Sequence, residues 1–516
     1  MTGAVSPDRR RFLTAGAAVV GAAASAQLWL PSAARAGETP LPDGVFSLGV
    51  ASGDPLPDGV VLWTRLAPDP LNGGGMPDRP VPVEWEIGTD ERLGKPLRRG
   101  VAQARPEYGH SVHVDVRGLR PGREYWYRFR AGGRLSPVGR TRTAPHRLSS
   151  GGTLRVALAS CQNWQHGYFT PYADTRAQDP DVVLFVGDYI YESTPSATAL
   201  RRHEGTGEPY TLTQYRNRYA QYRTDPDLKA MHAAAPWVVT FDDHEVDNDF
   251  AGEVPQDPDK QSHDAFVARL TAAYQAYYEH MPVRASAIPT GAHIRMYRRL
   301  EFGRLARLNV LDTRQYRGDQ ATSQAGAQNP GLTMLGARQK QWLLDGLQDS
   351  PARWNLVASQ IMMAETDLLV GAGKQWFYDA WDGYQAERNR FLEEFKQVDN
   401  PVVLTGDRHL TMVTDLKEDF ADPDSDVVGA EFVGTSISSN GDQDQAAFRK
   451  EWDPRMPDNP HWKLLDAHRG YHLFDIRRDG IDAQVRIVDT VRTPQATPST
   501  LARLRVDAGR PGVRVV

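Results

Sequence analysis

Six apolar segments of this sequence are each followed at once by side chains that bind metal ions or transfer protons in proteins. These side chains are Cys161 after the first segment; Asp188, Tyr191 and Glu192 after the second; Asp243, His244 and Asn248 after the third; Asp312 and Arg314 after the fourth; Gln360 after the fifth; and Asp407 and His409 after the sixth. A single Asp or His at such a place usually caps a helix, closes a turn or makes a structural hydrogen bond. The joint occurrence is harder to explain in that way, because closely spaced carboxylates repel one another unless a cation lies between them. The pattern therefore predicts a metal site.

The ligand types predict two different ions. Carboxylate and amide oxygens suit hard cations such as calcium, magnesium or manganese. A thiolate and a phenolate suit a stronger Lewis acid that can deprotonate them, and ferric iron fits both. The set for such an ion is Cys161, Asp188, Tyr191 and His409, and the set for a harder ion is Asp188, Asp243, Asn248 and Asp407, with Asp188 shared. Two ions a few ångströms apart can bind the attacking and the leaving oxygen of a phosphoryl transfer.

Cys161 is the only cysteine of the chain, so disulfides do not hold this fold together. A lone cysteine is more often a small buried hydrophobic residue than a ligand. Its place between Ser160 and Gln162, directly after an apolar segment, favours the ligand role instead.

The apolar segments themselves indicate a sheet that is covered by helices on both faces. They span residues 155–159, 182–186, 237–241, 305–311, 356–358 and 402–404. Near-continuous apolar runs are typical of strands buried on both faces, and the predicted ligands follow the carboxyl ends where such sheets bind their ligands. Helical spacing is found at residues 212–223, 263–279 and 336–347, and further strands are predicted at 431–433, 471–476 and 484–488.

The region before residue 150 has a different pattern of apolar and polar residues. Residues 46–144 contain short runs of period two, as at Val112, Val114 and Val116, which predict an antiparallel sandwich. The run at 119–127 resembles the turn and following strand of a fibronectin type III domain. No cluster of titratable groups occurs here, so we expect a supporting or partner-binding role. Residues 144–152, which contain Pro and Gly, are the expected linker.

The first 36 residues predict an export signal. Arg9, Arg10 and Arg11 precede an Ala/Gly/Val-rich run, and Ala34 and Ala36 supply the small residues of a cleavage site. The Asp-Arg-Arg-Arg-Phe-Leu core resembles the twin-arginine type, with a plain secretory signal as the alternative. The run is too weakly apolar to remain as a transmembrane anchor, and no later stretch is long and apolar enough to serve as one. We expect a secreted protein that uses the twin-arginine export machinery.

The composition excludes some classes of protein. A hydrophobic fraction of 40% and a charged fraction of 24% are those of a soluble globular chain, and 516 residues are enough for more than one domain. The net charge is −5, and the leader is basic, so the rest of the chain is more acidic still. We therefore expect no stable binding of nucleic acid.

Five strings in the sequence resemble those of the alkaline phosphatase D family, the PhoD-like phosphatases. They are residues 160–162, 187–192, 242–245, 311–317 and 406–409, and the resemblance extends over nearly the whole chain after the leader, including residues 49–55. The family is part of the calcineurin-like metallophosphatase class and is similar to purple acid phosphatases in its core.

The resemblance implies an α/β fold and two kinds of metal ion. The implied core consists of mixed β-sheets flanked by helices, an αββα sandwich, and a small all-β fibronectin type III-like sandwich precedes it. The resemblance also implies a twin-arginine signal and the cofactors Fe3+ and Ca2+, with the two ligand sets given above. Gln360 stands where relatives of the wider class have a His ligand, so its role is left open. The expected division is 1–36 for the signal, 42–146 for the sandwich, 150–495 for the catalytic domain and 496–516 for a C-terminal tail or lid.

The predicted function is hydrolysis of phosphate mono- and diesters by metal-activated water. His244 stands beside the predicted ligands and would donate a proton to the leaving oxygen or bind the phosphate. Arg314 would grip a non-bridging oxygen with its planar guanidinium; an ion pair is the alternative, and the resemblance favours the phosphate. Nothing resembles the nucleophile elbow of a serine hydrolase, so we expect no covalent intermediate.

The sequence is compatible with several classes of substrate. Monoesters, nucleotide- or teichoic-type diesters and phospholipids share this chemistry, and some members of the family act as phospholipase D. Aromatic residues near the motifs would line a lipid site or belong to the core. They are Trp164, Tyr168, Phe169, Trp376, Phe377, Tyr378, Trp381 and Tyr384. A lid is conceivable at 371–384, and the remaining alternatives are a non-catalytic, metal-stabilised binding protein and a metal-dependent hydrolase of another bond.

Overall fold

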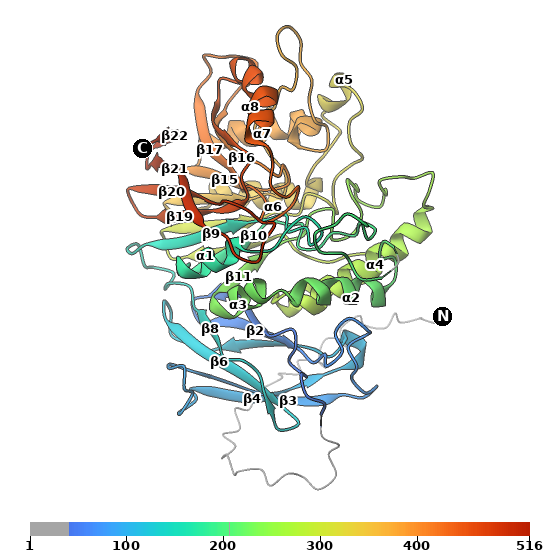
Figure 1. Ribbon diagram of the computed structural model, residues 1–516. Helices are drawn as coiled ribbons and strands as arrows, with labels where there is room; N and C mark the ends of the chain where they lie inside the picture. Colours follow the sequence, from blue (N-terminus) through green and yellow to red (C-terminus); the bar gives the residue numbers. More distant parts are fainter. Residues whose placement is uncertain (1–40, 206) are drawn as a thin grey trace, which may run out of the picture. The chain divides into compact units, whose positions relative to one another are not determined.

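The longest sheet joins the two regions that differ in sequence pattern. In the computed structural model, which describes residues 41–205 and 207–516, ten strands form one sheet in the order β22-β21-β20-β19-β9-β10-β11-β1-β2-β5 (Figure 1). Their bounds are β1 (Val50–Leu56), β2 (Gly59–Arg65), β5 (Ser111–Arg117), β9 (Leu154–Ala159), β10 (Val182–Phe185), β11 (Pro236–Val239), β19 (Gly470–Ile476), β20 (Gly480–Val488), β21 (Pro498–Asp507) and β22 (Arg510–Val515). The central strands β9, β10, β11 and β1 pair in parallel, as expected for strands without a solvent-facing side.

A second sheet of seven strands packs against the central part of the first. Its order is β12-β13-β14-β15-β17-β16-β18, and β13, β14, β15 and β17 are parallel. The bounds are β12 (Arg298–Phe302), β13 (Ala306–Val310), β14 (Trp354–Ala358), β15 (Pro401–Thr405), β16 (Thr411–Lys417), β17 (Val427–Val433) and β18 (Trp462–Asp466).

The alternation of side chains along each strand produces the four layers. In β10, Leu184 points into a core shared with the second sheet, whereas Val183 points into a core shared with helices. In β14, Leu356 likewise faces the first sheet and Val357 faces helices. Both sheets are therefore apolar on both faces, and the αββα arrangement implied by the family resemblance is present. The apolar runs by themselves indicated a sheet with helices on both faces; instead, each sheet packs against helices on one face and against the other sheet on its second face.

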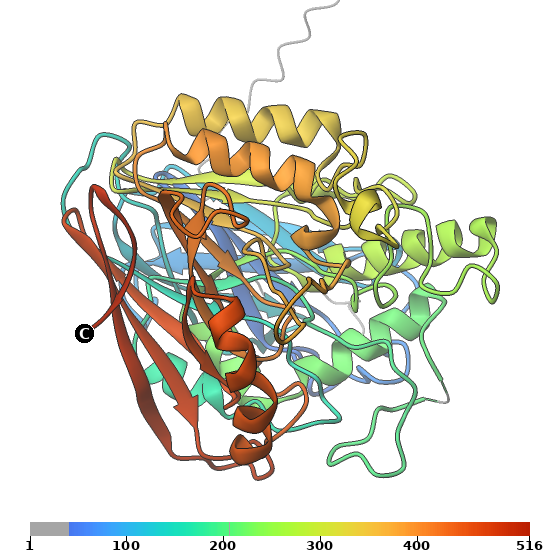
Figure 2. The same ribbon diagram turned by 90° about the horizontal axis from the view of Figure 1, so that it is seen from above.

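The helices cover the outer faces of the two sheets. Their bounds are α1 (Pro171–Ala177), α2 (Leu212–Arg223), α3 (Pro226–Ala234), α4 (His263–His280), α5 (Gln324–Ala327), α6 (Gly336–Gln348), α7 (Gln385–Phe395) and α8 (Gln445–Trp452), with 3-10 turns at η1 (Pro106–Tyr108), η2 (Ala285–Ala287), η3 (Trp381–Tyr384) and η4 (Asp453–Asp458). Helices α1 to α4 pack on the ten-stranded sheet, and α6 and α7 lie side by side on the seven-stranded one (Figure 2). Helix α2 begins at a capping box of Thr211 and Gln214, which satisfies two free N–H groups. No helix among the described residues has the length and apolarity needed to span a bilayer.

The front region is a sandwich, but it is not separate from the core. Its outer sheet has the order β4-β3-β6-β7, with β8 also on β6; the bounds are β3 (Val81–Gly88), β4 (Arg98–Ala104), β6 (Glu124–Ala131), β7 (Arg134–Leu135) and β8 (Gly139–Arg142). Its inner sheet is β1-β2-β5, which continues the ten-stranded sheet because Ser52 and Gly53 of β1 pair with Pro236 and Trp237 of β11. Residues 41–516 therefore form one compact unit, and the domain limits at 146 and 150 stay predictions from the sequence.

The C-terminus differs from the expectation of a tail or a lid. Residues 498–515 form β21 and β22 at the edge of the ten-stranded sheet, with β21 paired along β20. Only Leu504 and Val506 of β21 are buried, so the apolar pattern is too short to reveal a strand from the sequence. The predicted export signal, residues 1–36, lies outside the described residues.

Candidate metal centre

Ligand-type side chains from both sheets meet where the strands end. Donor atoms of Cys161, Asp188 and His409 lie within 4.8 Å of one another, and the same holds for Asp188, Asp243 and His244. A third group of this kind is Asp243, Asp249 and Asp379. Since Asp188 belongs to the first two groups and Asp243 to the last two, the three form one continuous chain of potential ligands.

Strained backbone turns hold these side chains in place. Cys161, Asp188, Asp407 and His409 have φ angles of 57°, 60°, 64° and 55°, in the left-handed region that side chains other than Gly rarely adopt. Gly187 has a φ of 115°, and a Cβ there would lie 2.4 Å from Cβ of Asp242. The glycine before Asp188 is therefore required by the close approach of two strand ends.

The predicted iron ligands lie together. The Tyr191 hydroxyl donates to Oδ2 of Asp188 (2.7 Å), lies 2.9 Å from Nε2 of His409 and accepts from Ser439 Oγ (2.7 Å). Nε2 of His409 lies 3.7 Å from Oδ2 of Asp188. The thiol of Cys161 is buried and, among the described residues, hydrogen-bonds only to Ser160 Oγ, at 3.2 Å.

The chemistry of this donor set fits a Lewis-acidic cation. Burial first, and Asp188 second, raise the pKa of the Cys161 thiol and of the Tyr191 phenol well above their usual values. Oδ1 of Asp188 is buried and has no hydrogen-bond partner among the described residues, which is costly unless another ligand binds it. A cation between these groups would satisfy that oxygen and stabilise the thiolate and phenolate.

The carboxylates of the second predicted set are also crowded. Burial raises the pKa of Asp407 to about 8, and the charges of Asp243 and Asp379 add to this effect. Burial together with Asp379 and Asp243 raises the pKa of Asp249 to about 6. Asn248 lies half-buried in the same turn, where its backbone N–H donates to Glu192 (3.2 Å). Hard cations prefer oxygen ligands of this kind.

Arg314 is buried and paired with the carboxylates. Its side chain has no exposed surface; Nε donates to Asp242, Nη1 donates to Asp379 (2.9 and 3.0 Å), and Nη2 lies 3.6 Å from Oδ2 of Asp243. Burial raises the pKa of Asp243, but Arg314 and His244 outweigh burial and lower it. These contacts favour the ion-pair alternative for Arg314 over the predicted grip on phosphate.

His244 is held by a residue that follows the second strand. Its Nδ1 donates to Oε2 of Glu192 (2.7 Å), and its ring lies 4.1 Å from that of Tyr191, centroid to centroid. Burial lowers the pKa of the imidazole, but Glu192, Asp243 and Asp188 outweigh burial and raise it well above the ordinary value. The contact leaves Nε2 as the nitrogen from which a proton can be donated.

Gln360 is a structural residue and not a ligand. Its Oε1 accepts from the backbone N–H (3.0 Å) and the hydroxyl (2.6 Å) of Thr313. Its Nε2 donates to Thr240 Oγ1 (2.8 Å) and to the carbonyl of Leu311 (2.7 Å). With its polar atoms engaged in this way, the buried amide ties the ends of β11 and β13 together across the two sheets.

Several residues around the centre were assigned no role from the sequence. They are Glu192, Asp249, Asp379, Arg408 and Ser439. Glu192 and Arg408 stand inside the recognised strings, so their position was a usable signal, whereas Asp379 and Ser439 come from irregular segments that carry none. Arg408 stands out because its guanidinium lies 4.8 Å from the ring centroid of Phe377 and its buried Nε has no hydrogen bond. No carboxylate of residues 41–205 or 207–516 lies within ion-pair distance of it.

The aromatic residues considered for a lipid rim divide into two groups. Phe169, Trp376, Trp381 and Tyr384 are buried, and Trp164, Tyr168, Phe377 and Tyr378 are half-buried. Half of the set therefore belongs to the core, which is the commoner fate of such residues.

Comparisons with known proteins agree with this arrangement. The chain matches the model of the PhoD-like phosphatase over residues 156–485 and that of the N-terminal domain of PhoD-like phosphatases over residues 32–145. It is 45% identical to alkaline phosphatase D of Bacillus subtilis (strain 168) over 483 residues, which cover 91% of this chain and 82% of that protein. The solved structure of PhoD superposes with a TM-score of 0.89 at 45% identity and covers 93% of each chain. The predicted family, fold class and enzyme class are confirmed, and the chain belongs to the PhoD-like phosphatase family of phosphoric ester hydrolases.

Proposed function

We propose that this chain is an exported phosphoesterase that hydrolyses phosphate mono- and diesters at the metal centre. The observation that carries the proposal is the continuity of the three ligand groups through Asp188 and Asp243. A shared carboxylate is the arrangement by which two cations are held close enough to act on one phosphate.

The residues divide into two ligand sets. Cys161, Asp188, Tyr191 and His409 would hold ferric iron, since a thiol and a phenol beside a buried carboxylate suit a strong Lewis acid. Asp188, Asp243, Asn248 and Asp407 would hold calcium, and Asp249, which shares a group with Asp243, is a further oxygen donor. When bound, the ions supply a nucleophile from water at neutral pH and offset the negative charge of the phosphate.

The remaining polar residues bind the substrate, move a proton or position the ligands. His244, held by Glu192 through Nδ1, donates a proton from Nε2 to the leaving oxygen. Arg408, whose guanidinium has no acidic partner in the described part of the chain, contacts a non-bridging phosphate oxygen in the role first considered for Arg314. Arg314 instead positions Asp242 and Asp243 through its buried guanidinium.

Export follows from the leader. The twin arginines before an Ala/Gly/Val-rich run and a small-residue cleavage site predict a secreted enzyme that reaches the outside already folded. Replacement of Arg9, Arg10 and Arg11 by Lys should leave the protein inside the cell, as measured by fractionation. Unchanged secretion of this variant would favour the plain secretory signal.

The activity is tested with three substrates. Turnover of an aryl phosphate monoester, a bis-aryl phosphodiester and phosphatidylcholine should be measured for the wild type and for Asp188→Ala. We expect hydrolysis of the two soluble esters and its loss in the variant. Activity confined to phosphatidylcholine would establish the phospholipase alternative, and hydrolysis of none of the three would support the non-catalytic one.

A further inference from the structure

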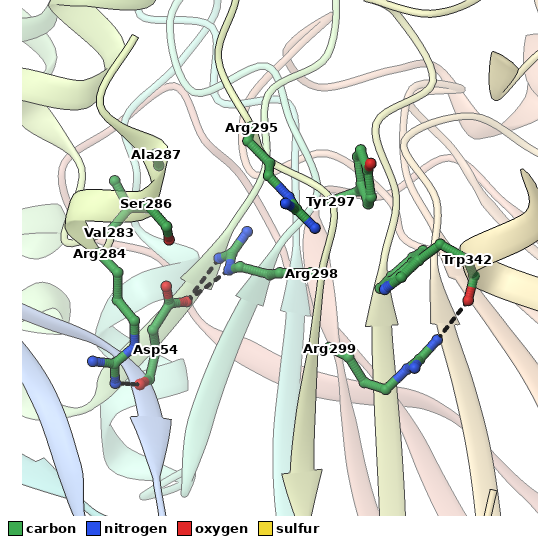
Figure 3. Close-up of a pocket in the computed structure, with 10 residues that line it drawn as sticks. All are labelled: Asp54, Val283, Arg284, Ser286, Ala287, Arg295, Tyr297, Arg298, Arg299 and Trp342. Atoms are coloured by element: carbon green, nitrogen blue, oxygen red, sulfur yellow. Dashed lines mark hydrogen bonds and ion pairs between the residues drawn. The ribbon is translucent and has the colours of Figure 1, made fainter. Parts of the chain in front are cut away.

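An arginine-lined cavity lies at the edge of the seven-stranded sheet, apart from the metal centre. It has a volume of about 310 Å³, and its lining includes Asp54, Arg284, Arg295, Arg298, Arg299 and Trp342 (Figure 3). Arg284 follows α4, Arg298 and Arg299 begin β12, and Trp342 comes from α6. None of the lining residues belongs to the three ligand groups.

Two of the guanidinium groups are neutralised within the protein. Arg298 donates from Nε (2.9 Å) and Nη2 (2.8 Å) to Oδ1 of Asp54. Arg284 pairs with Asp115 and also donates to the carbonyl of Asp54 (2.6 Å). Asp54 is the only carboxylate in the lining, so no acidic group of the cavity remains for the other arginines.

Neither of the other two guanidinium groups has an ion pair in residues 41–205 and 207–516, although Glu301, Asp345 and Asp349 lie near Arg299; burial, with Arg307, lowers the pKa of Arg299 more than these carboxylates raise it. Arg299 donates to neutral acceptors, Oδ1 of Asn309 (2.6 Å) and the carbonyl of Trp342 (2.9 Å). Arg295 is exposed and lies 5.1 Å from the ring centroid of Tyr297. Figure 3 shows its guanidinium on the same side of the cavity as that of Arg298, the group that Asp54 neutralises. The cavity thus keeps the full charge of Arg295 and the partly offset charge of Arg299.

A second cavity extends the positive surface. Its volume is about 430 Å³, and it shares Arg295 and Tyr297 with the first and adds Arg338 and His293. No carboxylate lines it, although the chain as a whole has a net charge of −5. Like charges gathered at a concave surface raise the local concentration of ligands of the opposite sign.

We propose that the two cavities form a binding site for a small, multiply charged phosphate-type anion, separate from the metal centre. A single carboxylate would neutralise Arg295 alone, whereas a phosphate-type anion has further charged oxygens for Arg299, whose charge the nearby carboxylates offset only in part. The planar guanidinium matches the spacing of phosphate oxygens and binds two of them at once. Free phosphate and the phosphate group of a larger ester share this chemistry.

The test is calorimetric titration of the metal-loaded protein with inorganic phosphate at low ionic strength. The wild type should bind two equivalents, one at the metal centre and one in the cavity. Asp188→Ala should lose the first and keep the second, so that failure of the metal centre and failure of this site are distinguished. The double variant Arg295→Gln with Arg299→Gln should weaken the second at least about tenfold and leave turnover of an aryl phosphate unchanged.

Two controls and two contrary results complete the design. Arg92→Gln removes an exposed arginine outside both cavities and should change neither event, and the single variant Arg295→Gln guards against misfolding of the double one. Binding of only one equivalent that disappears in Asp188→Ala would overturn the proposal, as would a second event that persists unchanged in the double variant. Titration of Asp188→Ala with phenyl phosphate then identifies the source: tighter binding than inorganic phosphate indicates an ester group, and equal or weaker binding indicates the free anion.

Discussion

The metal centre and the arginine-lined cavity both gather groups of like charge, but the protein compensates them in different ways. At the centre, Asp242 and Asp379 form ion pairs with Arg314, whose guanidinium is fully buried. Asp243 lies 3.6 Å from the same guanidinium. In the cavity, Asp54 neutralises Arg298 while Arg295 stays exposed without an acidic partner in the described chain. A buried charge has to be paired, whereas an exposed one is hydrated. The difference indicates that each site binds an ion opposite in sign to the charge that remains after internal pairing. The carboxylates of the centre would bind a cation, and the arginines of the cavity would bind an anion.

The largest expected effect is the loss of the shared ligand. Asp188→Ala should lower kcat/KM by at least about a thousandfold, because Asp188 belongs to two ligand groups. Metal analysis of the same preparation should show both ions reduced. Asp90→Ala, at an exposed turn, is the matched control. Normal turnover in Asp188→Ala would contradict the comparison, because the centre would then be active without the cation that its carboxylates are expected to bind.

His244 separates proton donation from metal binding. His244→Gln should lower kcat for an alkyl phosphate by about a hundredfold to a thousandfold with its metals retained, and less for an aryl phosphate whose leaving group needs no proton. Because Glu192 raises the pKa of His244 against the effect of burial, the donor loses its proton, and activity falls, as the pH rises through that pKa. This alkaline limb should vanish in the variant and persist in His263→Gln, an exposed control. Equal losses for both substrates would contradict proton donation.

Asp379 tests whether internal pairing positions the ligands. Asp379→Asn weakens the contact with Nη1 of Arg314 (2.9 Å), and metal affinity should fall by about tenfold to a hundredfold. Added metal should restore most of the activity, a rescue that a general folding defect would not show. Titration with metal under circular dichroism checks both points. An unchanged affinity would mean that Arg314 balances charge without orienting Asp243.

His472 shows what burial does to a charge with no partner. It lies in β19 of the ten-stranded sheet, and neither of its ring nitrogens has a hydrogen-bond partner among the described residues. Burial lowers its pKa to about 3. Between that value and the ordinary 6.5, the unfolded chain binds more protons than the folded one, so stability falls as the pH falls. At pH 5 the loss should be about 2 kcal/mol. His472→Phe should remove it, as measured by urea unfolding at pH 8 and pH 5; the same loss in the variant would refute this assignment.

Ionic strength gives the smallest effect. Raising the salt from 0.05 to 0.5 M should weaken phosphate binding in the cavity about fivefold, because exposed charges are screened over about 10 Å or less. Metal retention at the buried centre should hardly change. Equal sensitivity of the two sites would remove the distinction between them.

The sequence predicted those parts of the centre that depend on local position. Cys161, Asp188, Asp243 and His409 each stand directly after a strand or in the turn that follows it, and the carboxyl ends of parallel strands meet at one edge. Asp379 reaches the centre from a long irregular segment, and no periodic pattern announces such a contact. The sequence indicated that Arg314 belongs to the centre, but it did not show whether Arg314 binds a carboxylate or a phosphate, since a guanidinium binds both with the same geometry.

The fold shows the same limit. The six apolar runs predicted the parallel strands β9, β10, β11, β13, β14 and β15, because strands buried on both faces need such runs. The pairing of β1 with β11, which merges the front sandwich with the core, depends on contacts between residues far apart in the chain. Strand β21 was missed because most of its side chains face outward.

The most direct test of the central claim is the metal content and visible spectrum of the purified protein beside Tyr191→Phe. Tyr191 contacts Asp188 and His409 through its hydroxyl, so a bound ferric ion should give a phenolate charge-transfer band in the wild type that the variant loses, while a band from the Cys161 thiolate remains. We expect iron and calcium together with that band. A colourless wild type that is fully active with zinc alone or without metal would contradict the account, because Cys161 and Tyr191 would then be structural residues.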